Sequence, residues 1–345
     1  MNTKVIQAEA LSRWVEAVFC QLGVTPEYAK MAAHTMVRTE MRGISTHGVT
    51  RLASYLEKIN SGEVNPRPDI RVHRLPGVCT IEADGALGQV AASIGIEESV
   101  QMLKDSASVI CRIQNCGHLG ALGHYSLLAA EQGLLALVFQ RTPPLLALPG
   151  YEQRAVGNNP IAFGCPIPNQ PPLVFDMACS VAARGHILLA AREGREIPLG
   201  WALDANGQPT TDAEAALAGS LLPTADHKGL GLAIMAECLA GALAGGEPES
   251  RQKVQTAPRS GAAGSQTTLM WLVNPAHAGA SSFSSYMQEW ADGFHQRSGP
   301  NGRLPGERAA ACEITAAKNG IRIPESLAVE LDAIASAQKM HVPWN

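Results

Sequence analysis

Apolar side chains recur every three to four positions through the N-terminal part of the chain. Three segments show this period, Ala8–Leu22, Pro26–Met41 and Val49–Ile59, and each leaves polar residues on the opposite face. Gly62 then ends the third segment, and the linker Asn65–Pro68 that follows is punctuated by proline. The sequence therefore predicts three amphipathic helices before the linker.

After the linker, short apolar runs alternate with segments of helical period. The predicted strands are Val78–Asp84, Ser108–Ile113, Leu134–Phe139, Ile161–Gly164, Leu173–Met177 and Thr267–Val273. The predicted helices are Val90–Leu103, Ala121–Gln132, Val181–Glu193, Gly229–Ala244, Ser284–Gln296 and Glu325–Gln338. This alternation predicts an α/β layer architecture. The segment Glu247–Gln266 is polar and rich in Gly, Ser and Pro, so an exposed loop is expected there.

Composition narrows the class of protein. The chain has 345 residues, enough for two domains with a sizeable buried core. Apolar residues make up 46% of it and charged residues 17%, which is typical of a folded globular protein. The formal net charge is −4 and no long run of like charges occurs, so nucleic acid is not an expected partner.

The chain shows no pattern of export or membrane insertion. The long apolar segment Gly229–Ala244 is shorter than a bilayer span and carries Glu237. Met1–Ala8 lacks the apolar run of a signal peptide. The eight cysteines form no CxxC pair, which favours reduced thiols. We therefore expect a cytoplasmic protein without a membrane segment.

A histidine lies between hydroxyl residues and arginines at the junction of the second and third predicted helices. Within the run Arg42–Arg51, Thr46 precedes His47, and Arg51 follows four residues later. An imidazole with a pKa near neutrality can give a proton to oxygen or nitrogen while hydride arrives at carbon. A guanidinium one helical turn away can grip a substrate carboxylate. The alternative is that His47 only caps a helix and that Arg51 is a solvated surface charge.

Three further runs place polar residues where elements are predicted to begin or end. Asn115–Tyr125 joins a strand end to a helix start, where free backbone amides suit a phosphate, but no GxGxxG follows any predicted strand. Gly157–Pro160 forms a turn, and Phe175–Ser180 carries an Asp at a strand end. Asp226–Gly229 precedes an apolar helix, with Lys228 placed to meet an anion. Each run alone can equally be part of the loop structure.

Taken together and in order, these runs resemble the malate/L-lactate dehydrogenase-like family. This family includes ureidoglycolate dehydrogenase, diketogulonate reductase and the piperideine/pyrroline-2-carboxylate reductases. The stretches that carry the resemblance are Arg42–Gly48, Gly117–Gly120, Gly157–Ala162, Asp176–Ala178, Gly194–Pro198, Trp201–Asp212, His227–Gly229 and Arg303–Arg308. They are collinear with the family pattern, and the resemblance covers nearly the whole chain.

The resemblance implies an α/β fold unrelated to the Rossmann type. The expected architecture is an NAD(P)-binding mixed sheet with flanking helices, plus a helical domain built from both chain ends. Residues 63–279 are expected to form the NAD(P)-binding domain, and residues 1–62 and 280–345 a helical domain for dimerisation and substrate binding. NAD or NADP is the implied cofactor, and no metal is expected. The implied partners are a small 2-oxo or 2-hydroxy acid and a second copy of the chain.

The resemblance also implies roles for individual residues. His47 is the expected proton donor, Thr46 takes the place of a Ser that orients it, and Arg51 matches the arginine that binds the substrate carboxylate. Asn158 and His186 are expected near the substrate. The residues that match the cofactor-contacting stretches of the family are His118, Gly120, Asp176, Met177, Ala178, His227, Lys228, Arg303, Leu304, Pro305, Gly306, Glu307 and Arg308.

Three of these positions depart from the family pattern. Thr46 replaces the usual Ser, which keeps the hydroxyl but adds a methyl group. Asn158 replaces the Thr that is common in a GTNP turn. His186 stands where relatives carry Lys or Asp. Because the imine reductases use that Asp as a relay to the catalytic His, His186 argues against an imine substrate.

The leading interpretation is therefore hydride transfer between NAD(P)H and a 2-oxo acid, with a 2-hydroxy acid as product. The alternative within the family is a cyclic ketimine (piperideine/pyrroline-2-carboxylate) reductase. A relative that keeps the dinucleotide site without turnover is a further hypothesis. A zinc hydrolase that uses His118 and His124 is another, although their spacing does not match HExxH.

The helices nearest the chain ends carry many aromatic residues. These are Trp14, Phe19, Phe283, Tyr286 and Trp290. They supply more aromatic surface than one small helical layer needs, so we expect the first and last helices to contribute to a dimer contact.

Overall fold

The computed structural model of the chain describes residues 3–248 and 266–344. Its helices are α1 (Ala8–Gln21), α2 (Pro26–Met41), α3 (Leu52–Asn60), α4 (Gly88–Met102), α5 (Leu122–Glu131), α6 (Arg184–Arg192), α7 (Ala213–Ala218), α8 (His227–Ala236), α9 (Phe283–Ser298), α10 (Glu307–Asn319) and α11 (Glu325–Ala337). Two short 3-10 turns, η1 (Ser45–His47) and η2 (Val49–Arg51), precede α3, and a π-helical segment, η3 (Glu237–Leu243), continues α8. The expected loop Glu247–Gln266 lies almost entirely outside the described residues.

The strands form three sheets. They are β1 (Thr3–Ile6), β2 (Arg71–Leu75), β3 (Val78–Glu82), β4 (Ser108–Cys116), β5 (Leu135–Gln140), β6 (Pro144–Leu146), β7 (Val156–Gly157), β8 (Ile161–Cys165), β9 (Leu173–Met177), β10 (Ala202–Leu203), β11 (Pro209–Thr210), β12 (Ser220–Leu221), β13 (Gln266–Val273) and β14 (Ile321–Pro324). The central sheet has seven strands in the order β2-β3-β4-β13-β5-β8-β9. It is mixed, because β3 and β4 pair in parallel and its other pairs are antiparallel.

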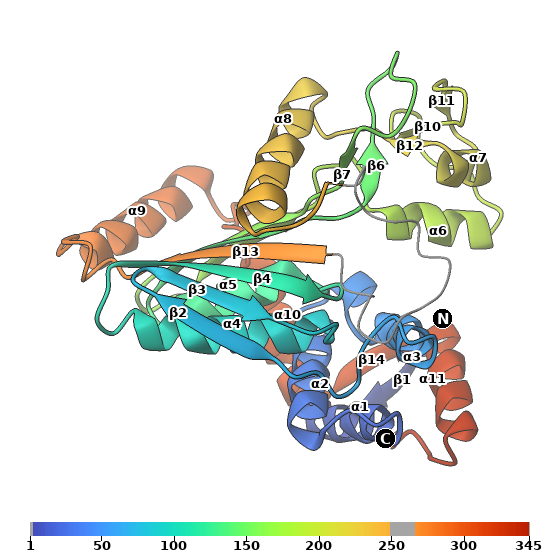
Figure 1. The fold of residues 1–345 in the computed structure, drawn as a ribbon, viewed down its shortest axis with the longest axis horizontal. Helices are drawn as coiled ribbons and strands as arrows, with labels where there is room; N and C mark the ends of the chain where they lie inside the picture. Colours follow the sequence, from blue (N-terminus) through green and yellow to red (C-terminus); the bar gives the residue numbers. More distant parts are fainter. Residues whose placement is uncertain (1–2, 249–265, 345) are drawn as a thin grey trace.

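Helices cover both faces of the central sheet. Figure 1 shows α4 and α5 below the sheet and α8 above it. The side chains between the sheet and α4 and α5 form a continuous apolar core that includes Ile81, Ile113 and Tyr125, all of which are fully buried. The predicted α/β architecture with a mixed sheet is thus confirmed.

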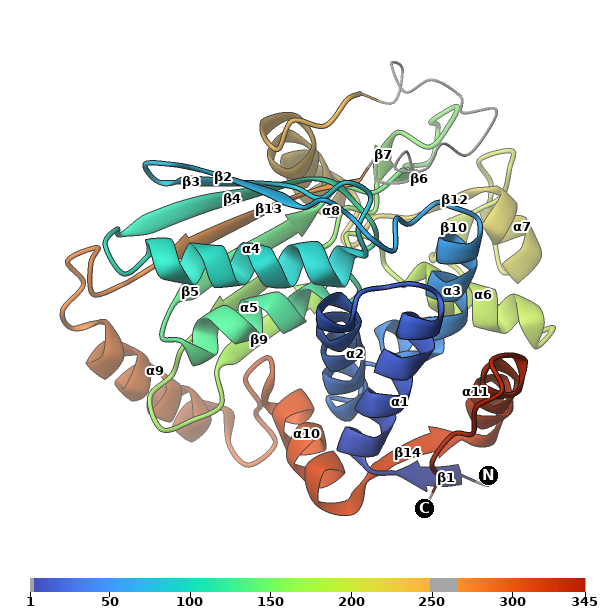
Figure 2. The ribbon, with the colours of Figure 1, turned by 60° about the horizontal axis from the view of Figure 1, so that its bottom comes forward.

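The two ends of the chain pack together. Strand β1 pairs antiparallel with β14, so that Thr3 lies opposite Pro324. Helices α1, α2, α3 and α11 surround this pair, and the two termini lie near each other in Figures 1 and 2. A second apolar core draws most of its members from residues 6–64 and 316–342. Helix α9 packs elsewhere, because its Ala291 lies in a small cluster with Ile167 and Leu304.

A third group of elements lies beside the central sheet. Five short strands in the order β11-β10-β12-β6-β7 form a small sheet, which packs with α6, α7 and α8. This unit lies across from α3 in both views (Figures 1 and 2). The division of the chain into domains that the sequence predicts stays a prediction.

Two predicted helices begin or continue differently in the structure. The helix predicted over Val181–Glu193 begins only at Arg184, because the Val181 amide donates to the Leu222 carbonyl at 2.9 Å and holds the preceding backbone extended. The helix predicted over Gly229–Ala244 begins at His227 and becomes π-helical at Glu237. Within the described residues, no helix has both the length and the apolar character needed to cross a membrane.

Candidate active site

A buried carboxylate shapes the turn that carries His47. Glu40, near the end of α2, is 5% exposed, and its Oε2 accepts the Val49 amide at 3.0 Å. Its side chain also bonds to Ser45, and burial raises its pKa. Between these two anchors the chain turns at Gly48, where an added Cβ would lie 2.1 Å from the Glu40 Oε2. Glu40, which the sequence reasoning did not single out, therefore holds the short turns η1 and η2 on α2.

Replacing Gly48 with alanine is expected to destabilise the protein, because the new methyl group overlaps a buried carboxylate that cannot withdraw without losing its bond to Val49. Overpacking of this kind costs about 1–3 kcal/mol. Urea unfolding measures the change. Gly231→Ala in α8, where the new Cβ meets nothing within 4 Å, is the matched control and is expected to be neutral or slightly stabilising. Equal stability of the two variants would contradict the role of Glu40.

The His47 imidazole is held on two sides. The Thr46 hydroxyl lies 3.0 Å from its Nδ1, and the His118 ring stacks on it with centroids 5.7 Å apart and planes at 28°. His118 is fixed in turn, since its Nδ1 lies 3.0 Å from the Tyr55 hydroxyl and accepts the Gly120 amide at 3.3 Å. With Nδ1 of His47 taken by Thr46, its Nε2 is the nitrogen left to meet a ligand.

Both stacked imidazoles are neutral at neutral pH. Burial, followed by the charges of Arg51 and His186, lowers the pKa of His47 to about 4. Burial, followed by Arg51 and His47, lowers the pKa of His118 to about 3. The charge of Arg51 thus lowers the pKa of His47, and an anion bound to Arg51 raises this pKa again.

Two cavities meet at His47. They share six lining residues, which are Thr46, His47, His118, Pro160, Ala178 and Ala183. One cavity, here called the Arg308 lobe, has a volume of about 480 Å³ and extends to α10. The other, the Arg51 lobe, has a volume of about 340 Å³ and extends between α3 and α6. Both volumes are in the range of small-ligand sites.

The Arg51 lobe brings together the predicted substrate residues. Arg51, at the end of η2, and Tyr55 of α3 line it, and so does Asn158 from the turn between β7 and β8. The Asn158 Oδ1 accepts the Ser180 amide at 2.8 Å, which fixes the orientation of this side chain. His186 of α6 acts electrostatically on His47, and its ring lies 6.3 Å from that of Trp201. Asn158 thus lines this lobe together with Arg51, whereas His186 is not among its lining residues, and the expectation that both lie near the substrate stays a prediction.

The Arg308 lobe contains about half of the predicted cofactor residues. Those that line it are His118, Gly120, Asp176, Ala178, Pro305, Gly306 and Arg308. The Asp176 Oδ2 accepts the Gly123 amide at 2.8 Å, and this carboxylate faces the cavity from the end of β9. Although Asp176 is accessible from the cavity, the surrounding protein displaces enough water to raise the pKa of its carboxyl to about 6.

The backbone amides at the start of α5 already have an acceptor within the chain. Asp176 already accepts hydrogen bonds from the amides of Gly123 and Leu122, which are the donors a phosphate would use. A second anion at the same place would meet this carboxylate. This contact has no local signal in the sequence, because Asp176 and Gly123 lie far apart along the chain and meet only through the packing of β9 on α5.

The remaining predicted residues lie outside the two lobes. Met177 lines neither, and Leu304 is buried in the small cluster beside α9. Arg303 and Glu307 line a separate cavity of about 690 Å³ between α2 and α10. His227 and Lys228 are exposed at the start of α8.

Replacing Lys228 with alanine remains a direct test of whether the cofactor reaches α8. If a cofactor phosphate lies at this helix start, loss of the cation is expected to raise the Kd of NAD(P)H about two- to tenfold. Fluorescence titration with NADH and NADPH measures it, and Lys318→Ala, on α10 and away from both lobes, is the control. An unchanged Kd in the Lys228 variant would place the dinucleotide away from α8.

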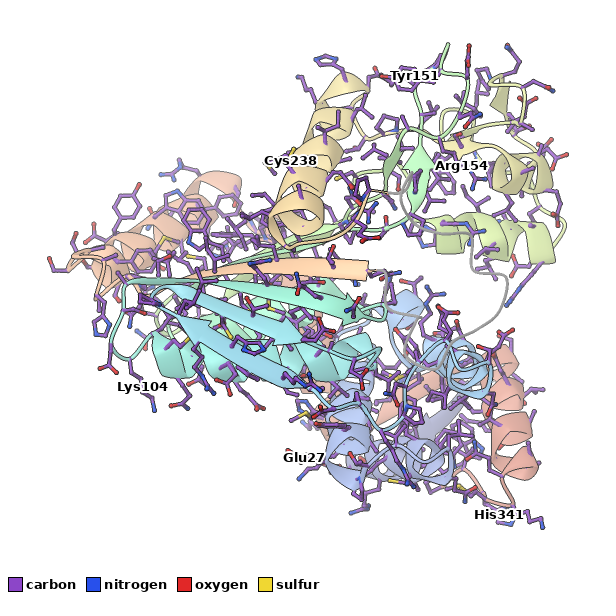
Figure 3. All side chains as sticks on the ribbon, in the orientation of Figure 1. Glu27, Lys104, Tyr151, Arg154, Cys238 and His341 are labelled. Carbon is purple, nitrogen blue, oxygen red and sulfur yellow. The ribbon has the colours of Figure 1, made fainter. Side chains whose placement is uncertain are left out.

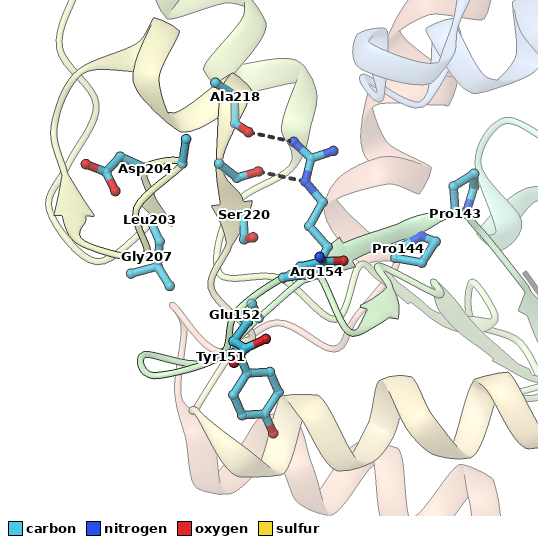
Figure 4. A pocket seen from close by; sticks show the side chains of 14 residues that line it. Pro143, Pro144, Tyr151, Glu152, Arg154, Leu203, Asp204, Gly207, Ala218 and Ser220 are labelled. Carbon is cyan, nitrogen blue, oxygen red and sulfur yellow. Dashed lines mark hydrogen bonds between the residues drawn. The ribbon is translucent and has the colours of Figure 1, made fainter. Parts of the chain in front are cut away.

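A cavity of about 780 Å³ is separate from this site. It lies between the loop after β6 and the small sheet, and none of the predicted site residues lines it. Figure 4 shows Arg154 there, with its guanidinium donating to the carbonyls of Gly219, at 2.7 Å, and Ala218, at 3.2 Å. Figure 3 places Tyr151 and Arg154 on the small-sheet unit, remote from Glu27 on α2. Because Arg154 is bound to backbone, its role here is to secure the end of α7.

Among the described residues, no three His, Cys, Asp or Glu side chains come together in a way that could hold a metal ion. His118 bonds to Tyr55, whereas His124 lies in a different environment beside His34 and Thr35. The two histidines that a zinc hydrolase would need thus have separate partners.

A mixed sheet without a Rossmann unit, joined to two cavities that meet at an imidazole, suits an oxidoreductase that moves a hydride at a carbon atom and a proton at the oxygen or nitrogen bonded to it. Comparison with known proteins gives the family. Residues 6–332 match the family model described as malate/L-lactate dehydrogenase. The chain therefore belongs to the malate/L-lactate dehydrogenase family, and it is an NAD(P)-dependent dehydrogenase or reductase.

Individual relatives support this assignment. A malate dehydrogenase of Pyrococcus horikoshii is 37% identical over 70% of this chain and 69% of its own. A (2R)-3-sulfolactate dehydrogenase (NADP(+)) of Chromohalobacter salexigens is 33% identical, covering 91% and 93% of the two chains. A Δ1-pyrroline-2-carboxylate/Δ1-piperideine-2-carboxylate reductase of Pseudomonas aeruginosa is 33% identical, covering 89% and 92%. The solved sulfolactate dehydrogenase of Methanocaldococcus jannaschii superposes with a TM-score of 0.85 at 29% identity, covering 98% of each chain.

Proposed function

We propose that the chain transfers a hydride between NAD(P)H and the C2 atom of a 2-oxo acid, with the 2-hydroxy acid as the reduced product. The observation that supports this most directly is the position of His47 at the junction of the two lobes, with Arg51 in one of them. The names of the relatives given above, which include a malate and a sulfolactate dehydrogenase, agree with such a substrate.

The residues of the Arg308 lobe fit a dinucleotide. Arg308 supplies a cation for a phosphate, and Asp176 supplies a carboxylate that can accept hydrogen bonds from the hydroxyl groups of a ribose. When bound there, NAD(P)H supplies the hydride. The protein then has two tasks, which are to present one face of the substrate carbonyl to this lobe and to place a proton donor beside its oxygen.

Arg51 and His47 perform these tasks in the proposed reaction. The Arg51 guanidinium binds the substrate carboxylate through both of its oxygens, which fixes the orientation of the adjoining carbonyl. As hydride bonds to C2, the carbonyl oxygen takes the proton from Nε2 of His47, and the imidazole becomes neutral. Thr46 holds the Nδ1 side of the ring throughout. In the reverse direction neutral His47 accepts the hydroxyl proton while C2 loses its hydride.

A spectrophotometric screen tests the proposed function. NADH and NADPH oxidation is followed with 2-oxo acids and, side by side, with piperideine-2-carboxylate. Turnover of a 2-oxo acid at a higher kcat/KM than the imine is the expected result. A preference for the imine would make the chain a cyclic ketimine reductase, and binding of NAD(P)H without oxidation by any substrate would indicate a site that has lost turnover.

The pH dependence of the two directions is expected to differ. Since kcat/KM reports the free enzyme, the low pKa of His47, about 4, sets both profiles. Reduction requires protonated His47, so its kcat/KM should fall about tenfold per pH unit above that pKa. Oxidation requires the neutral form, so its kcat/KM should stay level above pH 5 and fall only in more acidic buffer. Profiles of equal slope in both directions would contradict a role for His47 in proton transfer.

We propose further that the chain forms a homodimer. Trp14 and Phe19 are 4% and 0% exposed in the core of their own chain, so the expectation that they form a dimer contact is wrong. Exposed apolar residues lie on several elements: four of them, Leu232, Ile234, Met235 and Leu243, gather on α8 and η3, and Tyr286 of α9, which the sequence analysis named, is 65% exposed. Light scattering at micromolar concentration tests this proposal, and a monomer would refute it.

The cytoplasm is the compartment we propose. All eight cysteines are free, and five of them are buried, as in proteins kept in a reducing environment. Fractionation of cells that express the tagged chain tests this, and recovery from the periplasm or medium would overturn it.

A further inference from the structure

The Arg51 lobe is unusually cationic for a site that holds one carboxylate. Arg51, Lys58 and Arg184 all line it, and neither Asp nor Glu is among its lining residues in the described part of the chain. Lys58 forms an ion pair with Glu63, which offsets its charge. The exposed Arg184 side chain makes no hydrogen bond or ion pair with any residue in 3–248 or 266–344. One arginine is thus left over once Arg51 has bound the substrate carboxylate.

Arg184 and Arg51 lie on opposite walls of the lobe. Arg51 immediately precedes α3, whereas Arg184 is the first residue of α6 and Leu188 lies one turn further along the same wall. Helices α3 and α6 face each other in both views (Figures 1 and 2).

A small molecule that spans this lobe therefore meets a cation at each end. We propose, on the basis of the proposed function, that the substrate is a 2-oxo acid with a second anionic group at the far end of a short chain, and that Arg184 binds this group. The volume of about 340 Å³ admits a 2-oxo acid with a chain of a few carbons. Arg184 is then a residue that determines specificity, and the protonated imine of a cyclic ketimine finds no carboxylate partner in the lobe.

Pairs of 2-oxo acids of equal length test this proposal. Oxaloacetate is compared with 2-oxobutanoate, and 2-oxoglutarate with 2-oxopentanoate, because each pair differs only in a terminal carboxylate. The parent enzyme is expected to prefer the better diacid over its partner by about ten- to a hundredfold in kcat/KM. Arg184→Ala should remove this preference by lowering kcat/KM for the diacid alone, with kcat/KM for the monoacids and KM for NAD(P)H within about twofold of the parent.

Arg192→Ala is the matched control, because Arg192 ends the same helix and lines neither lobe. It is expected to keep the full preference for diacids. An equal loss for both members of a pair, a raised KM for NAD(P)H in the Arg184 variant, or a parent enzyme without preference for diacids would overturn the proposal. In those cases monoacids are still reduced and the proposed function stands. Absence of reduction for all four acids would instead overturn both.

Discussion

His47→Ala is expected to lower kcat for 2-oxo acid reduction by about two to four orders of magnitude, the usual contribution of a general acid. The imidazole is the group placed where the two lobes meet, and its Nε2 is free because Thr46 occupies Nδ1. Alanine leaves the cavity open to water, which donates a proton far less readily. Steady-state kinetics measures the loss.

Cofactor binding separates this effect from damage to the fold. The Kd of NAD(P)H, measured by fluorescence titration, should stay within about threefold of the parent, because Asp176 and Arg308 are unchanged. His73→Ala, on the exposed edge strand β2, serves as the control and should leave kcat unaltered. Turnover near the parent level in the His47 variant would remove this residue from the mechanism.

Arg51→Lys is expected to lower kcat/KM by about ten- to a thousandfold for every 2-oxo acid, since a bidentate charged contact contributes a few kcal/mol. Lysine keeps the positive charge but offers no planar pair of donors to fix the carboxylate. The carbonyl then has no preferred orientation toward His47. The loss should be the same for monoacids and diacids, in contrast to the selective loss expected for Arg184→Ala.

The alternative role of Arg51, as a solvated charge on the surface of α3, predicts a different outcome. In that case Arg51→Lys changes neither kcat/KM nor the melting temperature. Differential scanning fluorimetry with the same kinetic assays distinguishes the two. A silent substitution would leave the dehydrogenase assignment in place and remove the reason for proposing a 2-oxo acid.

The elements that the sequence predicted well are those with a strong local signal. Helix α2 begins and ends where expected because Pro26 can occupy a first turn and the apolar period continues to Met41. Strands β1 and β14 escaped prediction since each is four residues long and is stabilised by pairing with a partner over 300 residues away. The edge strand β2, with Arg71, His73 and Arg74 among its five residues, lacks the apolar run that marks a strand.

The residues of the candidate site also differ in how clearly the sequence marks them. His47, Thr46 and Arg51 could be predicted because one short run of sequence contains all three. Glu40 and Arg184 were missed, since a buried carboxylate on a helix and an arginine at a helix start carry no distinguishing pattern. The π-helical turn at Glu237 also has no local signal, because Arg141 and Asn159, which bond to that carboxylate, come from distant segments.

The walls of the Arg51 lobe belong to two bodies that pack independently. The α3 wall rests on the core formed by both chain ends, and the α6 wall rests on the core of the small sheet. A ligand bound between the two walls contacts both cores. Part of its binding free energy is therefore offset by the entropy lost when the two walls are held at a fixed separation. Bound substrate should thus reduce the motion of the two walls relative to each other.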